Sequence, residues 1–155
     1  MRRCGDLTPM ISQATLRGYR ATTYAVTLPA KNHIDCEMLG LRLNENSPQA
    51  DAFLKTAKAQ SITCLNAWNP QSRVLNVTRN MAAHQRLRRD LAAYIVLPHL
   101  GVPDRSTWRP EPGFAVLDLE TEKAMALAQR HGQFGIVRYE RGGIAELILT
   151  RLALK

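Results

Sequence analysis

Apolar and polar positions along the chain follow two periods, one typical of strands and one typical of helices. A run rich in β-branched and aromatic residues over 22–28, closed by Pro29, predicts a strand. Apolar residues recur at helical spacing over 50–57, directly after the cap-and-proline pair Ser47-Pro48. The other predicted elements are a helix over 9–17, a weak strand or irregular hairpin over 31–43, a strand over 61–68, a helix over 76–93, a strand over 114–119, a helix over 121–131, and a hairpin of 134–139 and 144–149 around Gly142-Gly143.

This alternation predicts an α+β or α/β fold, with residues 1–155 forming a single domain. We expect a mixed sheet of about four to six strands with three or four helices packed on it. Residues 1–7 are a candidate disordered end, and residues 98–112, which hold four prolines and one glycine, are expected to form an ordered loop.

Composition supports a folded chain outside the membrane. Apolar residues make up 45% of the 155 residues and charged residues 22%, which is enough apolar material for a core. No apolar run approaches the ~20 residues that a membrane span needs. The charged start Met1-Arg2-Arg3 is not followed by an apolar segment, so we expect a cytoplasmic protein with no membrane partner. The oligomeric state stays open.

The net charge of +8 is unevenly placed along the chain. Residues 1–52 sum to +1, residues 53–109 to +7 and residues 110–155 to 0. A local basic surface could attract phosphate, nucleic acid or an acidic protein. The alternative is a solvated helix face that only keeps the protein soluble.

The cysteines give no sign of a metal centre. Cys4, Cys36 and Cys64 are odd in number, widely spaced and without a Cys-x-x-Cys pair. Neither a disulfide framework nor a thiolate zinc site is indicated, and we expect no metal and no cofactor.

Two amide-bearing segments stand out because packing alone would not place amides there. Asn66 and Asn69 lie at the carboxyl end of the predicted buried strand 61–68, the kind of strand end where α/β sheets bind ligands. The alternative is that Asn69 only caps the turn, in an extended conformation before Pro70, while Trp68 fills the core. Asn80 falls on the inward face of the helix 76–93, together with Val77, Met81, Leu87 and Leu91, and should bond the Asn69-Pro70 turn or a ligand.

The segment Trp108-Arg109-Pro110-Glu111-Pro112 holds a carboxylate between two prolines. Restricted backbone gives Glu111 a fixed direction beside an indole and a guanidinium, which suits a binding or catalytic site. A surface loop that the prolines merely stiffen is the alternative.

Taken in order, these motifs resemble the bacterial proteins grouped as domain of unknown function 3293. The resemblance runs from about Tyr19 to Val137. It is carried by Tyr24 after Thr22-Thr23, Ala67-Trp68-Asn69-Pro70, Asn80, Trp108-x-x-Glu111-Pro112 and Gly132-Gln133. The resemblance implies that Trp68, Asn69, Pro70, Asn80, Trp108, Glu111 and Gln133 are signature positions. The chain departs from the pattern at Asn66, where threonine is expected, and at Gly113, where serine is expected.

The leading hypothesis is a nucleotide-binding or RNA-binding protein. Amides and indoles can bond and stack on a base, and arginines can hold phosphate. The proposed ligand-binding residues are Trp68, Asn69, Asn80, Trp108, Gln133, Arg73, Arg79, Arg86 and Arg89. A second hypothesis is a hydrolase or endoribonuclease-like enzyme with Glu111 as general base. A third is a protein-interaction or toxin-system module whose basic helix binds an acidic protein. Whether the protein is an enzyme stays open.

Overall fold

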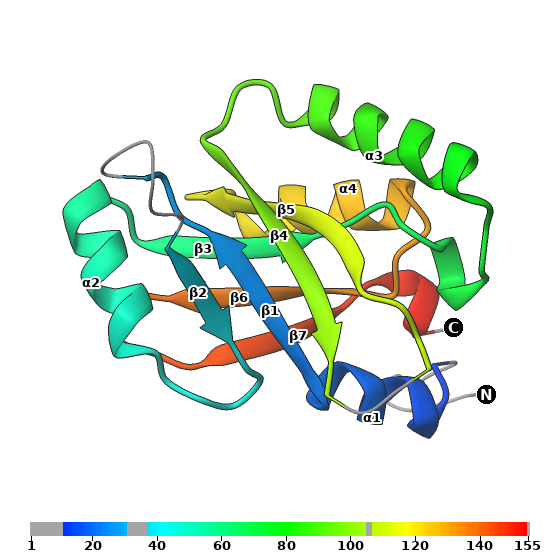
Figure 1. Cartoon of the computed structure of the whole chain (residues 1–155), viewed down its shortest axis with the longest axis horizontal. Helices are drawn as coiled ribbons and strands as arrows, with labels where there is room; N and C mark the ends of the chain where they lie inside the picture. The colour runs from blue at the N-terminus through cyan, green and yellow to red at the C-terminus, as the bar shows by residue number, and fades with distance from the viewer. Residues whose placement is uncertain (1–10, 31–36, 105–106, 155) are drawn as a thin grey trace, which may run out of the picture.

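One antiparallel sheet organises the molecule. The computed structural model describes residues 11–30, 37–104 and 107–154. Over these residues seven strands pair in the order β2-β1-β4-β5-β3-β6-β7, every neighbouring pair antiparallel (Figure 1). The elements are α1 (Gln13–Arg20), β1 (Thr22–Thr27), β2 (Met38–Leu41), α2 (Pro48–Ala57), β3 (Ser61–Leu65), η1 (Pro70–Ser72), α3 (Val77–Asp90), β4 (Val96–Pro103), β5 (Glu111–Leu117), α4 (Thr121–Arg130), β6 (Gly135–Glu140), β7 (Ala145–Leu149) and η2 (Arg151–Ala153).

The sheet curls until its two outer strands approach each other. Leu43, just after β2, forms an isolated parallel bridge with Ala145 at the start of β7. The Asn44 N–H donates to the Ala145 carbonyl at 2.8 Å, and the Ala145 N–H donates to the Glu45 carbonyl at 3.0 Å. These bonds use backbone groups that an open sheet would leave at its edges. The result is a partly closed barrel with a concave inner face and a convex outer face.

The central strands are buried on both faces. In β3, Ile62 and Cys64 belong to the core inside the barrel, and Leu65 belongs to a second core outside it. Both cores also draw on β5 and β6, because successive side chains of a strand point to opposite faces. The outer core is completed by α3 and α4, which lie together over one face of the sheet (Figure 1). Because both faces are covered, all five residues of β3 are buried, including the polar Ser61 and Thr63.

Helix α2 closes one end of the barrel. Its Ala50 and Leu54 are fully buried in the inner core. The hydroxyl of the buried Tyr139 accepts the Ser47 N–H at 3.1 Å and donates to Asp51 Oδ1 at 2.7 Å. Asp51 Oδ1 also accepts the Gly142 N–H at 2.8 Å. The start of α2 is therefore tied to the β6–β7 hairpin, and the barrel end beside it is filled.

The α+β class is confirmed, but three predictions about the sheet and the first helix are wrong. The sheet is antiparallel, not mixed, and has seven strands where about four to six were expected. The first helix was predicted over 9–17, but α1 begins at Gln13, after its cap Ser12, whose side chain accepts the Thr15 N–H. It runs to Arg20, with Gly18 inside it. The predictions for residues 1–7 and for Cys4 and Cys36 lie outside the described residues.

The segment 98–112 was expected to be a loop, and most of it is strand. β4 includes Pro98 and Pro103 and lies between β1 and β5. The two prolines lie at the ends of the stretch paired to β1: the pairs run from Thr22↔Pro103 to Val26↔His99, and Pro98 comes just beyond the last one. A proline removes a ladder donor, and this cost is small where the pairing ends.

The predicted inward face of helix α3 is confirmed for Asn80, Leu87 and Leu91 and is wrong for Val77 and Met81. Its buried residues are Asn80, Ala83 and Leu87, and Leu91 follows at its cap. Val77 and Met81, expected to face inward, are 65% and 40% exposed. The buried residues Asn80, Ala83 and Leu87 follow the helical spacing i, i+3 and i+7. Asn80 therefore takes a position on this face that an apolar residue would usually hold.

No helix in the described ranges has the length and apolar character that a membrane crossing requires.

The link between Tyr139 and α2 predicts a stability difference between two tyrosine variants. Tyr139→Phe leaves the buried Ser47 N–H without its acceptor, so the free energy of unfolding should fall by about 1–3 kcal/mol. Tyr94→Phe is the matched control, because the Tyr94 hydroxyl bonds Glu120 at the surface, and it should change stability by less than about 0.5 kcal/mol. Urea unfolding measures both, and equal losses would contradict a role for Tyr139 in fastening α2.

Candidate functional site

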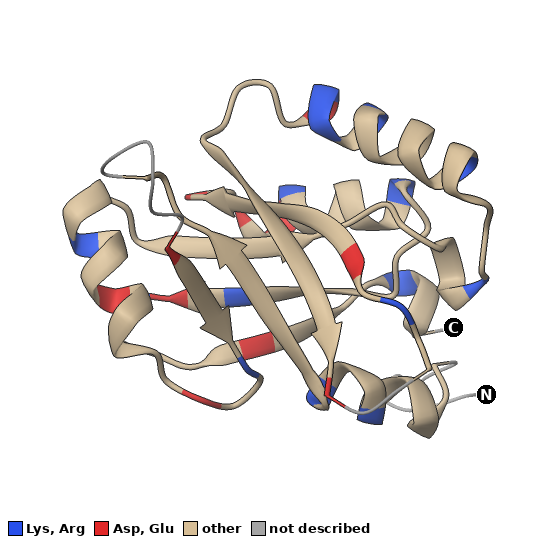
Figure 2. Ribbon diagram, in the orientation of Figure 1, with Lys and Arg blue, Asp and Glu red and all other residues tan. Residues whose placement is uncertain are grey.

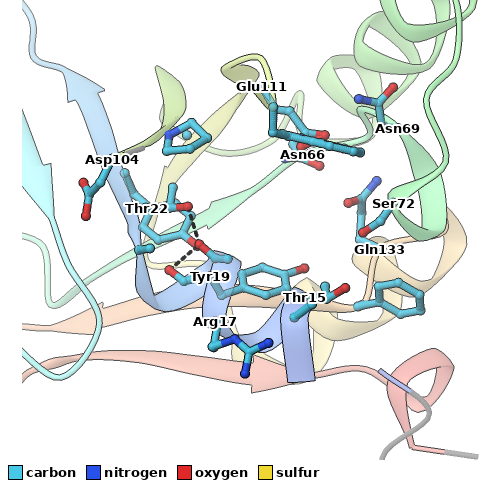
Figure 3. A pocket seen from close by; sticks show the side chains of 18 of the residues that line it. Thr15, Arg17, Tyr19, Thr22, Asn66, Asn69, Ser72, Asp104, Glu111 and Gln133 are labelled. Atoms are coloured by element: carbon cyan, nitrogen blue, oxygen red, sulfur yellow. Dashed lines mark hydrogen bonds between the residues drawn. The ribbon is translucent and has the colours of Figure 1, made fainter. Parts of the chain in front are cut away.

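A cavity of about 480 Å³ lies at the end of the barrel opposite α2. Its walls come from α1, from the strand ends that face it, and from the turn that follows β3. Figure 3 shows Glu111 and Asn66 on one side, Tyr19 of α1 on another, and Asn69, Ser72 and Gln133 beside them. The aromatic lining residues are Tyr19, Tyr24, Trp108 and Phe134, and the polar ones used below are Asn66, Asn69, Ser72, His99, Glu111 and Gln133. We call this space the Glu111 cavity.

Asn69 is held in the turn after β3 by Asn80. The Asn69 N–H donates to Asn80 Oδ1 at 2.9 Å, and Asn80 Nδ2 donates to Asn69 Oδ1 at 2.8 Å. The Leu75 N–H also donates to Asn69 Oδ1, at 3.0 Å. A backbone N–H donates to one side-chain atom of each asparagine, so that atom must be the amide oxygen. The Nδ2 group of Asn69 is therefore the part of its amide that faces the cavity. The structure confirms that Asn80 bonds the Asn69-Pro70 turn.

Asn69 was expected to be extended, and this prediction is wrong. Its φ and ψ are 44° and 63°, in the left-handed region. Proline disfavours the right-handed helical region for the residue before it, and asparagine tolerates the left-handed region better than most residues. The hydrogen bonds from Asn80 stabilise this conformation.

Gly132 and Gln133 brace the same turn from the other side. Gly132 has a φ of +72°, and a Cβ there would lie 2.7 Å from the Cβ of Pro70, so only glycine fits. The Gln71 N–H donates to the Gly132 carbonyl at 2.7 Å, and Gln133 Nε2 donates to the Trp68 carbonyl at 3.1 Å. These contacts give a physical reason for the Gly132-Gln133 signature.

The carboxyl group of Glu111 is the main electrostatic feature of the cavity. Burial raises its pKa to about 7, against an opposing effect of hydrogen bonds with the side chains of Trp108 and Asn69. Near neutral pH this group therefore exists in both protonation states. A carboxyl group with this pKa can accept hydrogen bonds from a ligand or exchange a proton with it.

Two tyrosines line the cavity together with Glu111. Burial and the charge of Glu111 raise the pKa of Tyr19, and burial raises that of Tyr24, so both phenols stay protonated. The Tyr24 hydroxyl donates to the Tyr19 carbonyl at 3.2 Å and ties β1 to the end of α1. The cavity thus has flat aromatic surfaces beside its carboxyl group.

His99 completes the inner wall next to Gly113. Its ring stacks on Tyr24 with centroids 6.1 Å apart, and burial lowers its pKa to about 4, so it is neutral. A Cβ on Gly113 would lie 2.5 Å from both His99 Cε1 and the Leu65 carbonyl oxygen. A serine at this position therefore does not fit beside His99, which explains the departure from the expected motif.

Four of the predicted ligand-binding or catalytic residues share the cavity: Asn69, Trp108, Glu111 and Gln133. Asn80 lies behind Asn69 and positions it, with only 2% of its surface exposed. Trp68 does not line the cavity, and its ring packs edge-on against His84, with centroids 6.2 Å apart.

The arginines were expected to border the same cleft, and the structure does not place them there. Arg79, Arg86 and Arg89 line a separate groove, and Arg73 lines neither space. The Asn69-Pro70 turn and the Gly132-Gln133 pair divide the two, since each contributes one residue to the cavity and its neighbour to the groove. Among the described residues that line the cavity, Arg17 is the basic one, and Figure 3 shows it pointing away from the other side chains.

Sequence reasoning missed Tyr19, Tyr24, His99 and Phe134 as site residues. In the structure Leu97 and His99 are buried while Pro98 and Leu100 are exposed, which is the period of a strand. The residue types do not show this period, because the buried residue at 99 is polar and the exposed residue at 100 is apolar. The position of Tyr19 depends on how α1 lies over the barrel end, and no local pattern shows that.

No group of three or more potential metal ligands occurs within residues 11–30, 37–104 and 107–154.

Comparison with known proteins gives one family. Residues 65–136 match the sequence model of a family described as "Protein of unknown function (DUF3293)". No curated protein and no solved structure matches the chain. The matched segment contains the Asn69 turn, Asn80, Trp108, Glu111 and Gln133, and it leaves out Tyr19 and Tyr24.

The Asn80–Asn69 pair predicts a linked effect on stability and on Glu111. Asn80→Ala leaves the buried Asn69 N–H unpaired, so the free energy of unfolding should fall by about 2 kcal/mol. The pKa of Glu111, measured by carboxyl ¹³C NMR titration, should also rise as Asn69 is released. Asn46→Ala, at an exposed position, is the matched control and should change neither. An unchanged Glu111 pKa in Asn80→Ala would contradict the positioning role.

The raised pKa of Glu111 predicts a pH-dependent stability. Its ordinary pKa is 4.5 and its folded value is about 7. Between these values the unfolded chain releases the proton and the folded chain keeps it, so stability falls as pH rises through this range. Glu111→Gln should lack this fall and should gain stability relative to the native protein above pH 7. Glu122→Gln, on an exposed residue of α4, should follow the native profile, and parallel profiles for all three proteins would refute the shifted pKa.

Proposed function

We propose that this protein, residues 65–136 of which match the model of the DUF3293 family of unknown function, binds the base of a nucleoside or nucleotide in its cavity. The observation that carries this proposal is a carboxyl group with a pKa of about 7 inside an aromatic-walled cavity.

The size and walls of the cavity suit a flat polar ring. A volume of about 480 Å³ falls within the range of small-molecule sites. Aromatic side chains stack on every base, and such contacts contribute about 1–3 kcal/mol per base. The amides of Asn66, Asn69 and Gln133 provide donors and acceptors for a base edge. The cavity therefore offers both stacking and edge recognition.

The charge of the cavity decides which part of a nucleotide enters it. A phosphate placed beside Glu111 would be repelled, and Arg17 points outward. The carboxylate instead favours a group with N–H donors. Guanine presents two adjacent N–H donors on its pairing edge, which a carboxylate accepts with both oxygens. Guanine is thus the base that we expect to bind best, with the sugar and any phosphate toward solvent.

A titration series tests this proposal. Guanosine, adenosine, cytidine and uridine are titrated at pH 8, followed by calorimetry and by quenching of tryptophan fluorescence. Guanosine should bind most tightly, and its monophosphate should bind no more tightly than the nucleoside. Guanosine affinity should rise with pH through about 7, because the ionised form of Glu111 is the acceptor.

Variants identify the residue responsible. Glu111→Gln should weaken guanosine binding at pH 8 about ten-fold to a hundred-fold, the range for losing a charge-assisted hydrogen bond. Glu122→Gln should bind like the native protein. Equal weak binding of all four nucleosides, unaffected by Glu111→Gln, would refute the proposal.

Acid–base catalysis is the second candidate function, favoured by the pKa of Glu111 and the neighbouring Tyr19 phenol. A group that titrates near neutrality can take up a proton and return it in one cycle. Incubation with nucleosides and short RNA, followed by chromatography of the products, tests this role. Product formation that Glu111→Gln abolishes supports it, and identical product yields from the two proteins remove Glu111 from any reaction.

A further inference from the structure

A second hollow, separate from the Glu111 cavity, runs between α3 and the end of α4. Its volume is about 740 Å³. The charged and ionisable residues that line it are Arg79, Arg86, Arg89, Asp90, Arg130 and His131. Figure 2 shows basic residues at both ends of α3 and at the ends of α4. We call this hollow the arginine groove.

The acidic residue of the groove already has partners within the protein. Asp90 Oδ2 lies 2.8 Å from His131 Nε2 and 3.8 Å from an Arg130 nitrogen. In the described part of the chain, no ion pair includes Arg79, Arg86 or Arg89. All three are exposed. The groove therefore presents three guanidinium groups whose charge no carboxylate of the described residues offsets.

The spacing of these arginines follows one face of α3. Arg86 lies about 10 Å along the helix from Arg79, and Arg89 lies about 15 Å from it. Arg88 is on the same helix but about 180° around it from Arg79 and does not line the groove. A row of this length matches an extended anion with repeated charges better than a single phosphate ion. Guanidinium groups bind phosphate oxygens in a two-pronged geometry.

We propose that the arginine groove binds the phosphodiester backbone of single-stranded RNA. The choice of RNA rests on the proposed function, because the Asn69-Pro70 turn that walls the groove also walls the cavity expected to take a base. An RNA strand whose phosphates lie in the groove would place the next nucleotide beside this turn, close to the cavity. The groove supplies affinity without reading the sequence, and the cavity supplies base selection.

Two double variants with the same net charge test the groove. Arg79→Gln combined with Arg86→Gln removes two arginines of the groove. Arg73→Gln combined with Arg88→Gln removes two exposed arginines outside it. The probe is a fluorescein-labelled oligouridylate of about ten nucleotides, within the span that single-strand-binding modules cover. Fluorescence anisotropy at several salt concentrations gives the affinity and its salt dependence.

The groove variant should bind the oligouridylate at least about ten-fold more weakly, with the salt slope reduced by about 1.4 for two lost phosphate contacts. The control variant should bind within about two-fold of the native protein, since exposed charges outside the site act only at long range. Equal losses in the two double variants would overturn the groove, because only total charge would then matter.

Two further measurements separate this inference from the proposed function. If polyglutamate binds more tightly than oligouridylate with the same dependence on Arg79 and Arg86, the groove takes an acidic protein and the RNA assignment is wrong. Guanosine binding should be unchanged in the groove variant and lost in Glu111→Gln. If guanosine fails to bind and the groove still selects RNA, the proposed function of the cavity fails and the groove stands.

Discussion

The paired amides of Asn69 and Asn80 are the contact on which the described site depends. Two hydrogen bonds, of 2.9 and 2.8 Å, join a left-handed residue after β3 to a buried residue in the first turns of α3. A buried amide without partners is costly, so each asparagine constrains the other. The turn they hold is the wall between the Glu111 cavity and the arginine groove. Its conformation therefore sets the shape of both.

The curl of the sheet creates the cavity that this turn completes. Strands that bury both faces need a core inside and a core outside, and α2 fills only one end of the inside. At the other end α1 lies over a space lined by rings and amides. Removing Glu111 from water there moves its pKa to about 7. A fold-level constraint thus produces a chemically unusual carboxyl group.

Separation of charges follows from the same arrangement. The carboxyl group is inside the barrel end, whereas the arginines of α3 lie on the far side of the Asn69 turn. The arginines belong to the strongly basic segment 53–109, and Glu111 comes just after that segment ends. Their helix buries Asn80, Ala83 and Leu87, and so turns its guanidinium groups away from the carboxyl group. Two adjoining parts of the sequence therefore contribute to two surfaces of different character.

Local patterns were sufficient for most of the elements and for part of the site. Cap and proline signals located α2, an apolar run located β3, and two glycines located the β6–β7 hairpin, because these features act over a few residues. The amide of Asn80 on a helix predicted its bond to the Asn69 turn. By contrast, the strand β4 was hidden by its prolines, whose tolerance depends on where the pairing with β1 ends. Only the tertiary structure decided that Tyr19, His99 and Glu111 line one cavity and that the arginines lie outside it. The curl of the sheet and the docking of the helices bring together residues that are far apart in the sequence, and no local pattern shows this.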